Sequence, residues 1–140
     1  MSQATKEKET AQVIPSDLED LLQTTTLADI ATLGPNGEPQ VTPVWFGWDG
    51  ELIRFSSVRG RQKARNTDRD PRIAVLIVDP SNPYRYIEIR GTVERVEDDP
   101  PGAYIDEMAK KYMGVDEYPY KKDGDERVIV VIRPEYVSKR

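Results

Sequence analysis

The residues best suited to bind a charged ligand gather between positions 59 and 72. Six residues of this segment are basic and two are acidic, so it carries a net charge of +4 within a chain of net charge −5. Ser56 and Ser57 precede it, and its middle is expected to form a short helix. Hydroxyl, guanidinium and ammonium groups beside a helix N-terminus suit phosphate oxygens. The segment predicts a phosphate site that uses Arg61 and Lys63. The alternative is a solvated helix whose arginines pair with nearby acids.

A second candidate is Pro43, which interrupts a strand-like sequence over residues 40–48. Proline cannot donate to a sheet ladder, so it belongs on an edge or at a bulge. Unpaired backbone beside it can hydrogen-bond the polar edge of a planar heterocycle. The alternative is that Pro43 only protects an edge strand against aggregation. Aromatic residues, Trp45 included, more often pack in cores, although tyrosines can also stack on a ring or donate a proton. The tyrosines considered are Tyr84, Tyr86, Tyr112, Tyr118 and Tyr120.

The chain contains no histidine and no cysteine. These absences exclude disulfides, zinc sites built from Cys and His, and catalysis by Ser–His or Cys–His pairs. The acidic clusters indicate solvated loops, and no metal site is expected. An enzyme of this composition would rely for its chemistry on a cofactor or on simple positioning of the reactants. The acidic net charge argues against nucleic acid as a partner.

Turn signals divide the chain into alternating strand-like segments. Hairpins are predicted at Asn36-Gly37 and, as a two-residue turn, at Asp49-Gly50, and a bulge at Gly91. Strands are expected over 27–33, 40–48, 51–58, 72–78, 84–96 and 128–132, the last extended by 136–137. Helices are expected from a capping box at Ser16–Glu19, over 60–70, and from Pro100-Pro101 to Met113. This pattern predicts a mainly β, antiparallel barrel with short helices at its openings.

One domain is expected over residues 14–140, after a flexible tail at 1–13. No apolar segment is long enough to span a membrane, and the N-terminus lacks a signal-peptide pattern. A cytoplasmic protein without a membrane or nucleic-acid partner is therefore the expectation.

Five segments in this order carry a family resemblance: residues 27–33, 37–46, 55–66, 70–72 and 90–93. The K-x-x-N spacing of Lys63 and Asn66 is the most useful single part. The sequence resembles the FMN-binding split-barrel family related to pyridoxamine 5′-phosphate oxidase, and more closely its branch that uses the deazaflavin coenzyme F420. The resemblance spans about Asp17 to Val137.

The resemblance implies a homodimer of split barrels with cofactor sites at the subunit interface. Ser56, Ser57, Arg61 and Lys63 would hold the phosphate, and Pro43, Val44 and Trp45 would lie along the ring system. Val58 and Asn66 belong to the same motif, and Tyr84 would approach from the other subunit. Cofactor-binding residues are thus expected at Pro43, Val44, Trp45, Ser56, Ser57, Val58, Arg61, Lys63, Asn66 and Tyr84, with no catalytic residue assigned.

The implied activity is an oxidoreductase that transfers hydride between F420 and an unsaturated small molecule. F420 carries a lactyl-phosphate and an oligoglutamate tail, which the extra arginines Arg59, Arg65 and Arg69 would meet. The alternatives are an FMN-dependent oxidoreductase of the same fold and a non-catalytic F420 carrier. A haem-binding relative is disfavoured because the chain lacks a histidine ligand.

Overall fold

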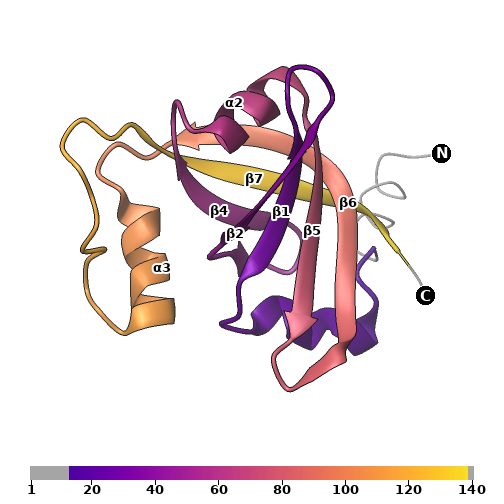
Figure 1. The fold of residues 1–140 in the computed structure, drawn as a ribbon. Coiled ribbons are helices and arrows are strands. Elements are labelled where there is room, and N and C mark those ends of the chain that lie inside the picture. The colour runs from indigo at the N-terminus through magenta and orange to yellow at the C-terminus, as the bar shows by residue number, and fades with distance from the viewer. Residues whose placement is uncertain (1–12, 139–140) are drawn as a thin grey trace, which may run out of the picture.

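The computed structural model describes residues 13–138 and shows seven antiparallel strands that curl into a half-barrel with a few short helices (Figure 1). The mainly β, split-barrel expectation is therefore confirmed. The strands are β1 (Ala28–Leu33), β2 (Pro39–Val44), β3 (Gly47–Trp48), β4 (Ile53–Val58), β5 (Arg72–Asp79), β6 (Asn82–Asp98) and β7 (Arg127–Val137). The helical segments are η1 (Ser16–Gln23), α2 (Gln62–Arg69) and α3 (Ala103–Met113). Residues 1–12 of the expected N-terminal tail lie outside the described residues.

The strands follow the order β2-β1-β5-β6-β7-β4-β3 across the sheet. The edge strands β2 and β3 are thus consecutive in the sequence but lie at opposite edges of the sheet. The long strands β6 and β7 lie in the middle and join its two halves (Figure 1). Because β2 is an edge strand, the edge position predicted for Pro43 is confirmed. The chain must therefore cross the open side of the half-barrel between β2 and β3.

The core lies inside the curl of the sheet. Alternate residues of the strands point inward, as the two-residue period of a strand requires. Ile30, Phe55, Val75 and Ile89 are each at most 1% exposed. Burying a side chain of this size stabilises the fold by about 2 kcal/mol. The 3₁₀ helix η1 adds Leu21 and Leu22 to the same core.

Several predicted boundaries are wrong for local reasons. Ser16–Glu19 forms no capping box, because Pro15 occupies the N-cap position and Ser16 already lies within η1. The expected two-residue turn at Asp49-Gly50 is a four-residue loop, closed by the Asp49 N–H donating to the Leu52 carbonyl (3.2 Å). Helix α3 begins at Ala103 rather than at Pro100-Pro101, and the Asp99 carboxylate accepts the backbone N–H of Ala103 at 3.1 Å.

The most consequential error concerns the strand predicted over residues 40–48. It divides into β2 and β3, which pair with different neighbours, β1 and β4. Trp45 and Phe46 form the bend between them. One continuous strand cannot run through this bend, because β2 and β3 lie at opposite edges of the sheet.

Gly91 forms the predicted bulge, with a shift of register between β6 and β7 at Arg90 and Gly91. A Cβ at position 91 would overlap the backbone carbonyl of Arg133. Position 91 therefore requires glycine because the two strands lie very close together there, and not because its backbone has a positive φ. Within the described residues, no helix has both the length and the apolar character needed to cross a membrane.

Gly91→Ala is expected to lower the free energy of unfolding by about 1–3 kcal/mol, because the strand backbone at Arg133 must move. The matched control is Gly34→Ala, where the added methyl meets only the Glu38 side chain, which can turn away. Denaturant unfolding of both variants measures the difference. Equal stability losses would contradict the assignment of Gly91 to a close backbone contact.

Candidate functional site

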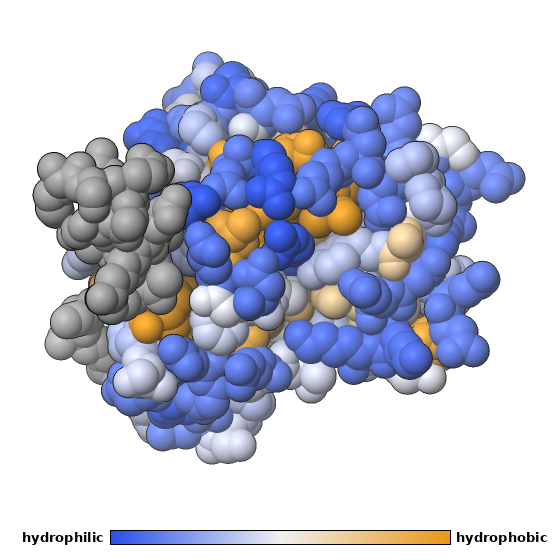
Figure 2. Space-filling model, turned by 180° about the vertical axis from the view of Figure 1, so that it is seen from behind, coloured by the Kyte–Doolittle hydropathy of each residue, from blue (hydrophilic) through white to orange (hydrophobic). Residues whose placement is uncertain are grey.

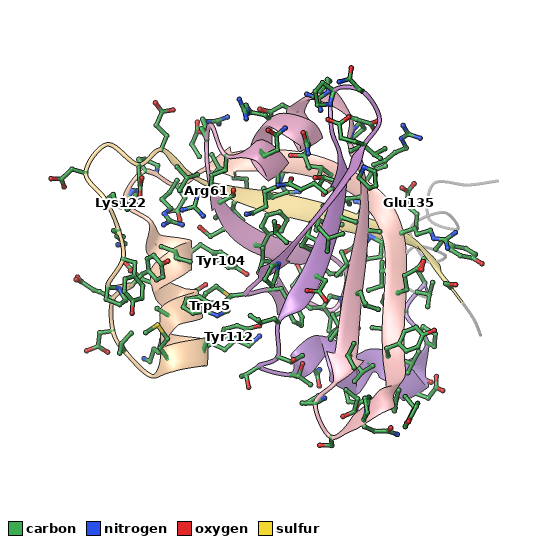
Figure 3. All side chains as sticks on the ribbon, in the orientation of Figure 1. Trp45, Arg61, Tyr104, Tyr112, Lys122 and Glu135 are labelled. Carbon is green, nitrogen blue, oxygen red and sulfur yellow. The ribbon has the colours of Figure 1, made fainter. Side chains whose placement is uncertain are left out.

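A pocket of about 190 Å³ opens between the strands and α3. It brings together β2, β4, the start of α2, α3, the loop after α3 and the start of β7. Its lining consists of Leu27, Pro43, Val44, Trp45, Ser56, Arg61, Lys63, Ile105, Tyr118 and Arg127. Figure 3 shows Arg61 towards the upper end of the space between α3 and the barrel, with Trp45 and Tyr112 further down.

This pocket contains most of the residues singled out from the sequence. Pro43, Val44, Trp45, Ser56, Arg61 and Lys63 all line it. The proline-interrupted segment and the basic segment are separate in the sequence, and the fold places them beside one another. The structure leaves the remaining predicted residues, Ser57, Val58, Asn66 and Tyr84, outside this lining.

Each of those residues has a different setting. Ser57 and Val58 are buried at the end of β4. Asn66 is completely buried and donates from its amide nitrogen to the hydroxyl of Thr32 (3.0 Å). It therefore fastens α2 to β1 and fixes the helix that carries Lys63. Tyr84 is 81% exposed and lines another hollow, so its predicted approach to a second subunit remains a prediction.

The basic segment divides into two functional groups. Arg59 pairs with Asp98 (2.6 Å) and Arg72 with Asp70 (2.7 Å). Arg69 donates to the carbonyl of Leu33 (2.9 Å). The expectation that Arg59 and Arg69 meet a ligand tail is not supported by these contacts, since both guanidinium groups bind the chain itself.

Arg65 likewise donates to the side chain of Gln62 (2.7 Å). Arg61 and Lys63 instead line the pocket. Burial, followed by repulsion from Arg61, lowers the pKa of Lys63. Cations held close together in a partly desolvated pocket attract an anion.

One of two serine hydroxyls that the described chain leaves unpartnered lies in the same pocket as these cations. The Oγ atoms of Ser56 and Ser57 have no hydrogen-bond partner within residues 13–138. Buried hydroxyls normally have partners. Ser56 lies in the pocket with Arg61 and Lys63, so its hydroxyl is placed to donate to a phosphate oxygen. The donor set therefore fits the phosphate of a nucleotide-like cofactor.

Two aromatic side chains, Trp45 and Tyr118, line the pocket, and Tyr112 packs against Trp45 from outside the lining. Trp45 stacks on Tyr112, with ring centroids 5.2 Å apart and planes 13° apart. The edge-to-face contact of Trp45 with Tyr118 has a centroid distance of 5.7 Å. Figure 3 shows Tyr104 and Tyr112 reaching from α3 towards the barrel, with Trp45 in the same space. Burial raises the pKa of Tyr104 to about 12, which keeps this phenol neutral near pH 7.

The bend at Phe46 is held by α3. The Phe46 N–H donates to the phenolic oxygen of Tyr112 (3.2 Å), which donates in turn to the Thr26 carbonyl (2.9 Å). Lys111 Nζ donates to the Phe46 carbonyl (3.0 Å). These contacts replace the ladder bonds that the bend gives up, and they dock α3 where it closes the pocket.

Sequence reasoning missed Arg127. It begins β7 and is only 6% exposed, yet it lines the pocket. A basic residue directly before the apolar run 128–132 was the available signal. That signal is weak, because only the pairing of β7 with β4, which sets Arg127 opposite Val58, brings it to the pocket.

Comparisons with known proteins agree with the fold. The family model for pyridoxamine 5′-phosphate oxidase matches residues 14–140. A solved structure titled F420 reductase is 41% identical, covers 91% of this chain and 100% of its own, and has a TM-score of 0.82. A conserved hypothetical protein from Mycobacterium tuberculosis is 25% identical, with coverages of 98% and 82% and a TM-score of 0.66.

General stress protein 26 from Bacillus anthracis is 18% identical, with coverages of 86% and 88% and a TM-score of 0.63. That likeness is one of fold. The family match covers most of the sequence, and the chain therefore belongs to the pyridoxamine 5′-phosphate oxidase family.

Tyr112→Phe is expected to cost about 1–3 kcal/mol of folding free energy, because it leaves the Phe46 N–H and the Thr26 carbonyl without their partner. Tyr120→Phe is the control, since Tyr120 is 65% exposed. Denaturant unfolding followed by tryptophan fluorescence reports both stability and the setting of Trp45. A Tyr112→Phe protein as stable as the Tyr120→Phe protein would contradict the role of this hydroxyl.

Proposed function

We propose that this protein is an F420-dependent oxidoreductase that transfers hydride between the deazaflavin and an unsaturated, planar small molecule. One observation carries the proposal. Ser56, Arg61 and Lys63 share a single pocket with the proline-interrupted segment Pro43–Trp45. An anion-binding end and a ring-binding end thus lie side by side. The 41% identity to a structure titled F420 reductase supports the choice of cofactor.

At the anionic end, Lys63 and Arg61 supply positive charge, and the orphan hydroxyl of Ser56 supplies a directed donor. Charge-assisted hydrogen bonds of this kind are shorter and stronger than neutral ones. Asn66 acts indirectly, because its buried hydrogen bonds hold α2 against β1. The phosphate would be held where these groups converge.

At the ring end, β2 offers the outer edge of its backbone because it pairs only with β1 within the sheet. The edge around Pro43 and Val44 is available to the polar rim of a flat heterocycle. The Trp45–Tyr112 stack beside it gives a flat apolar surface. The bound deazaflavin would supply the hydride, while the residues of this chain orient the ring and shield it from water.

The same arrangement supports a homodimer. The pocket of about 190 Å³ is smaller than the roughly 300–1,000 Å³ of typical ligand sites. A second copy would complete it, and Tyr84 on an exposed hairpin would reach the partner's site. An apolar hollow of about 380 Å³, lined by Ala31, Leu33, Ile73 and Tyr136 among others, offers contact surface. Figure 2 also shows apolar surface between charged side chains on the far face of the molecule.

The proposal predicts a dimer of about 32 kDa, twice the 15.9 kDa chain. Light scattering coupled to size-exclusion chromatography measures this mass. A protein that is monomeric across micromolar concentrations and still binds cofactor would contradict a site shared between subunits.

Lys63→Ala is expected to weaken F420 binding by about 1–3 kcal/mol, the scale of a charged hydrogen bond. Lys110→Ala is the control, because Lys110 is exposed on α3 and does not line the pocket. Cofactor fluorescence measures both affinities, with FMN titrated in parallel. Tighter binding of FMN than of F420, by about tenfold or more, would contradict the choice of cofactor. Unchanged F420 binding by Lys63→Ala would contradict the position of the site.

Affinity is also expected to fall at alkaline pH. Burial lowers the pKa of Lys63 in the free protein. A bound anion stabilises the protonated ammonium and raises this pKa again. Around the pKa of the free protein, Lys63 therefore takes up a proton when the anion binds. Affinity is therefore constant below the pKa of Lys63 in the free protein and declines as the pH rises through it. Lys63→Arg should remove this decline, because guanidinium stays protonated. Titrations between about pH 8 and about pH 10.4 test it, and identical profiles for the two proteins would contradict it.

Turnover separates an enzyme from a carrier. Reduced F420 is mixed with the protein and a set of planar unsaturated acceptors, such as quinones and enones, and oxidation is followed by cofactor absorbance. Protein-dependent oxidation with stoichiometric acceptor reduction supports the oxidoreductase. Tight binding without oxidation by any acceptor indicates a carrier instead.

A further inference from the structure

Arg127 is a buried cation in the cofactor pocket. It opens β7, and the β4–β7 register sets Arg127 opposite Val58 and Val128 opposite Ser57. Its side chain is 6% exposed and lines the same pocket as Ser56 and Lys63. The strand ladder therefore fixes its position, unlike that of a flexible surface arginine.

The charge of Arg127 is poorly compensated by the protein. Among the described residues, the ion pair of Arg127 is with Asp125, whose carboxylate oxygen lies 3.8 Å from Nη2, at the outer limit for such a contact. Asp106 interacts with Arg127 only through longer-range electrostatics. The Nε atom is buried without a hydrogen-bond partner in the described part of the chain. The guanidinium carbon lies 5.2 Å from the ring centroid of Tyr118. Buried arginines usually have close, hydrogen-bonded anionic partners, because desolvation is costly.

An anionic ligand would supply the missing partner. We propose that Arg127 is the inner ligand of the anionic group of the cofactor, deeper than Arg61, and that it positions the aromatic wall through Tyr118. The proposal rests on the proposed function and extends it to a residue outside the family motif of residues 55–66. A planar guanidinium offers two parallel donors, which match two oxygens of a phosphate.

The contact with Tyr118 links the two ends of the pocket. The ring of Tyr118 contacts the guanidinium of Arg127 and also makes an edge-to-face contact with Trp45. The backbone N–H of Tyr118 also donates to Asp106 on α3 (2.8 Å). An anion that fixes Arg127 would therefore also fix the aromatic surface against which the ring lies.

The test compares F420 with its phosphate-free fragment, which keeps the deazaflavin ring and the ribityl chain. Equilibrium fluorescence titrations are made with wild type, Arg127→Met, Arg127→Lys and Arg59→Met. The last is the matched control, since it removes an equal charge from an arginine that binds Asp98 outside the pocket lining.

Arg127→Met is expected to weaken F420 binding by about tenfold to a hundredfold, the effect of losing a charged hydrogen bond. Binding of the phosphate-free fragment should change by less than about threefold, because that fragment lacks the group that Arg127 contacts. Arg127→Lys should fall between wild type and Arg127→Met, since it keeps the charge and loses the fork. Arg59→Met should bind both ligands like wild type.

Stability gives an independent readout. Arg127 is a buried cation with only a long ion pair to Asp125. Replacing it by an apolar side chain of similar length should leave the ligand-free protein as stable as wild type or make it more stable. A structural arginine would behave in the opposite way. An Arg127→Met protein that is strongly destabilised or insoluble, or one that loses both ligands equally, would therefore overturn the proposal.

The outcomes also separate this inference from the proposed function. If wild type does not bind F420, the proposed function fails. If wild type binds F420 and Arg127→Met binds it equally tightly, only the assignment of Arg127 fails.

Discussion

The structure depends on the way α3 satisfies the backbone at Phe46. The chain leaves β2 at one sheet edge and enters β3 at the other, so the peptide groups between them have no ladder partner. Tyr112 and Lys111 supply those partners from a helix more than sixty residues later in the chain. Unpaired buried peptide groups are costly, so this contact makes the crossing possible. It also sets Trp45 against Tyr112 and closes the pocket with α3.

Charge in this protein is arranged by what each cation contacts. Most arginines of the segment 59–72 bind acids or carbonyl groups of the chain, as Arg59 binds Asp98. Lys63 and Arg127 are instead drawn into a pocket where the chain provides little compensation. In the proposed site, such an arrangement would cost stability in the free protein, and a bound anion would offset that cost. An acidic net charge is therefore compatible with a local concentration of positive charge.

The proposed phosphate end and the proposed ring end of the pocket are built from different kinds of structure. The phosphate end is built on the regular elements β4, α2 and β7, whose registers hold Ser56, Lys63 and Arg127. The ring end is built on the free edge of β2 and on Trp45, which belongs to the bend after it. A rigid anchor beside an adaptable surface suits a cofactor that must present one ring face to different acceptors.

Much of the fold could be predicted from local sequence. Alternation, hairpin signals and the bulge at Gly91 predicted the antiparallel barrel, because strand period and turn chemistry are short-range properties. Clustering of basic residues in the sequence also predicted Arg61 and Lys63 as ligand-binding residues, and both line the pocket. Only the tertiary structure decided that residues 40–48 break at Phe46, that Asn66 binds Thr32, and that Arg127 reaches the pocket. Each of these depends on partners far away in the chain, and a single sequence records which residues are present but not which distant strands pair.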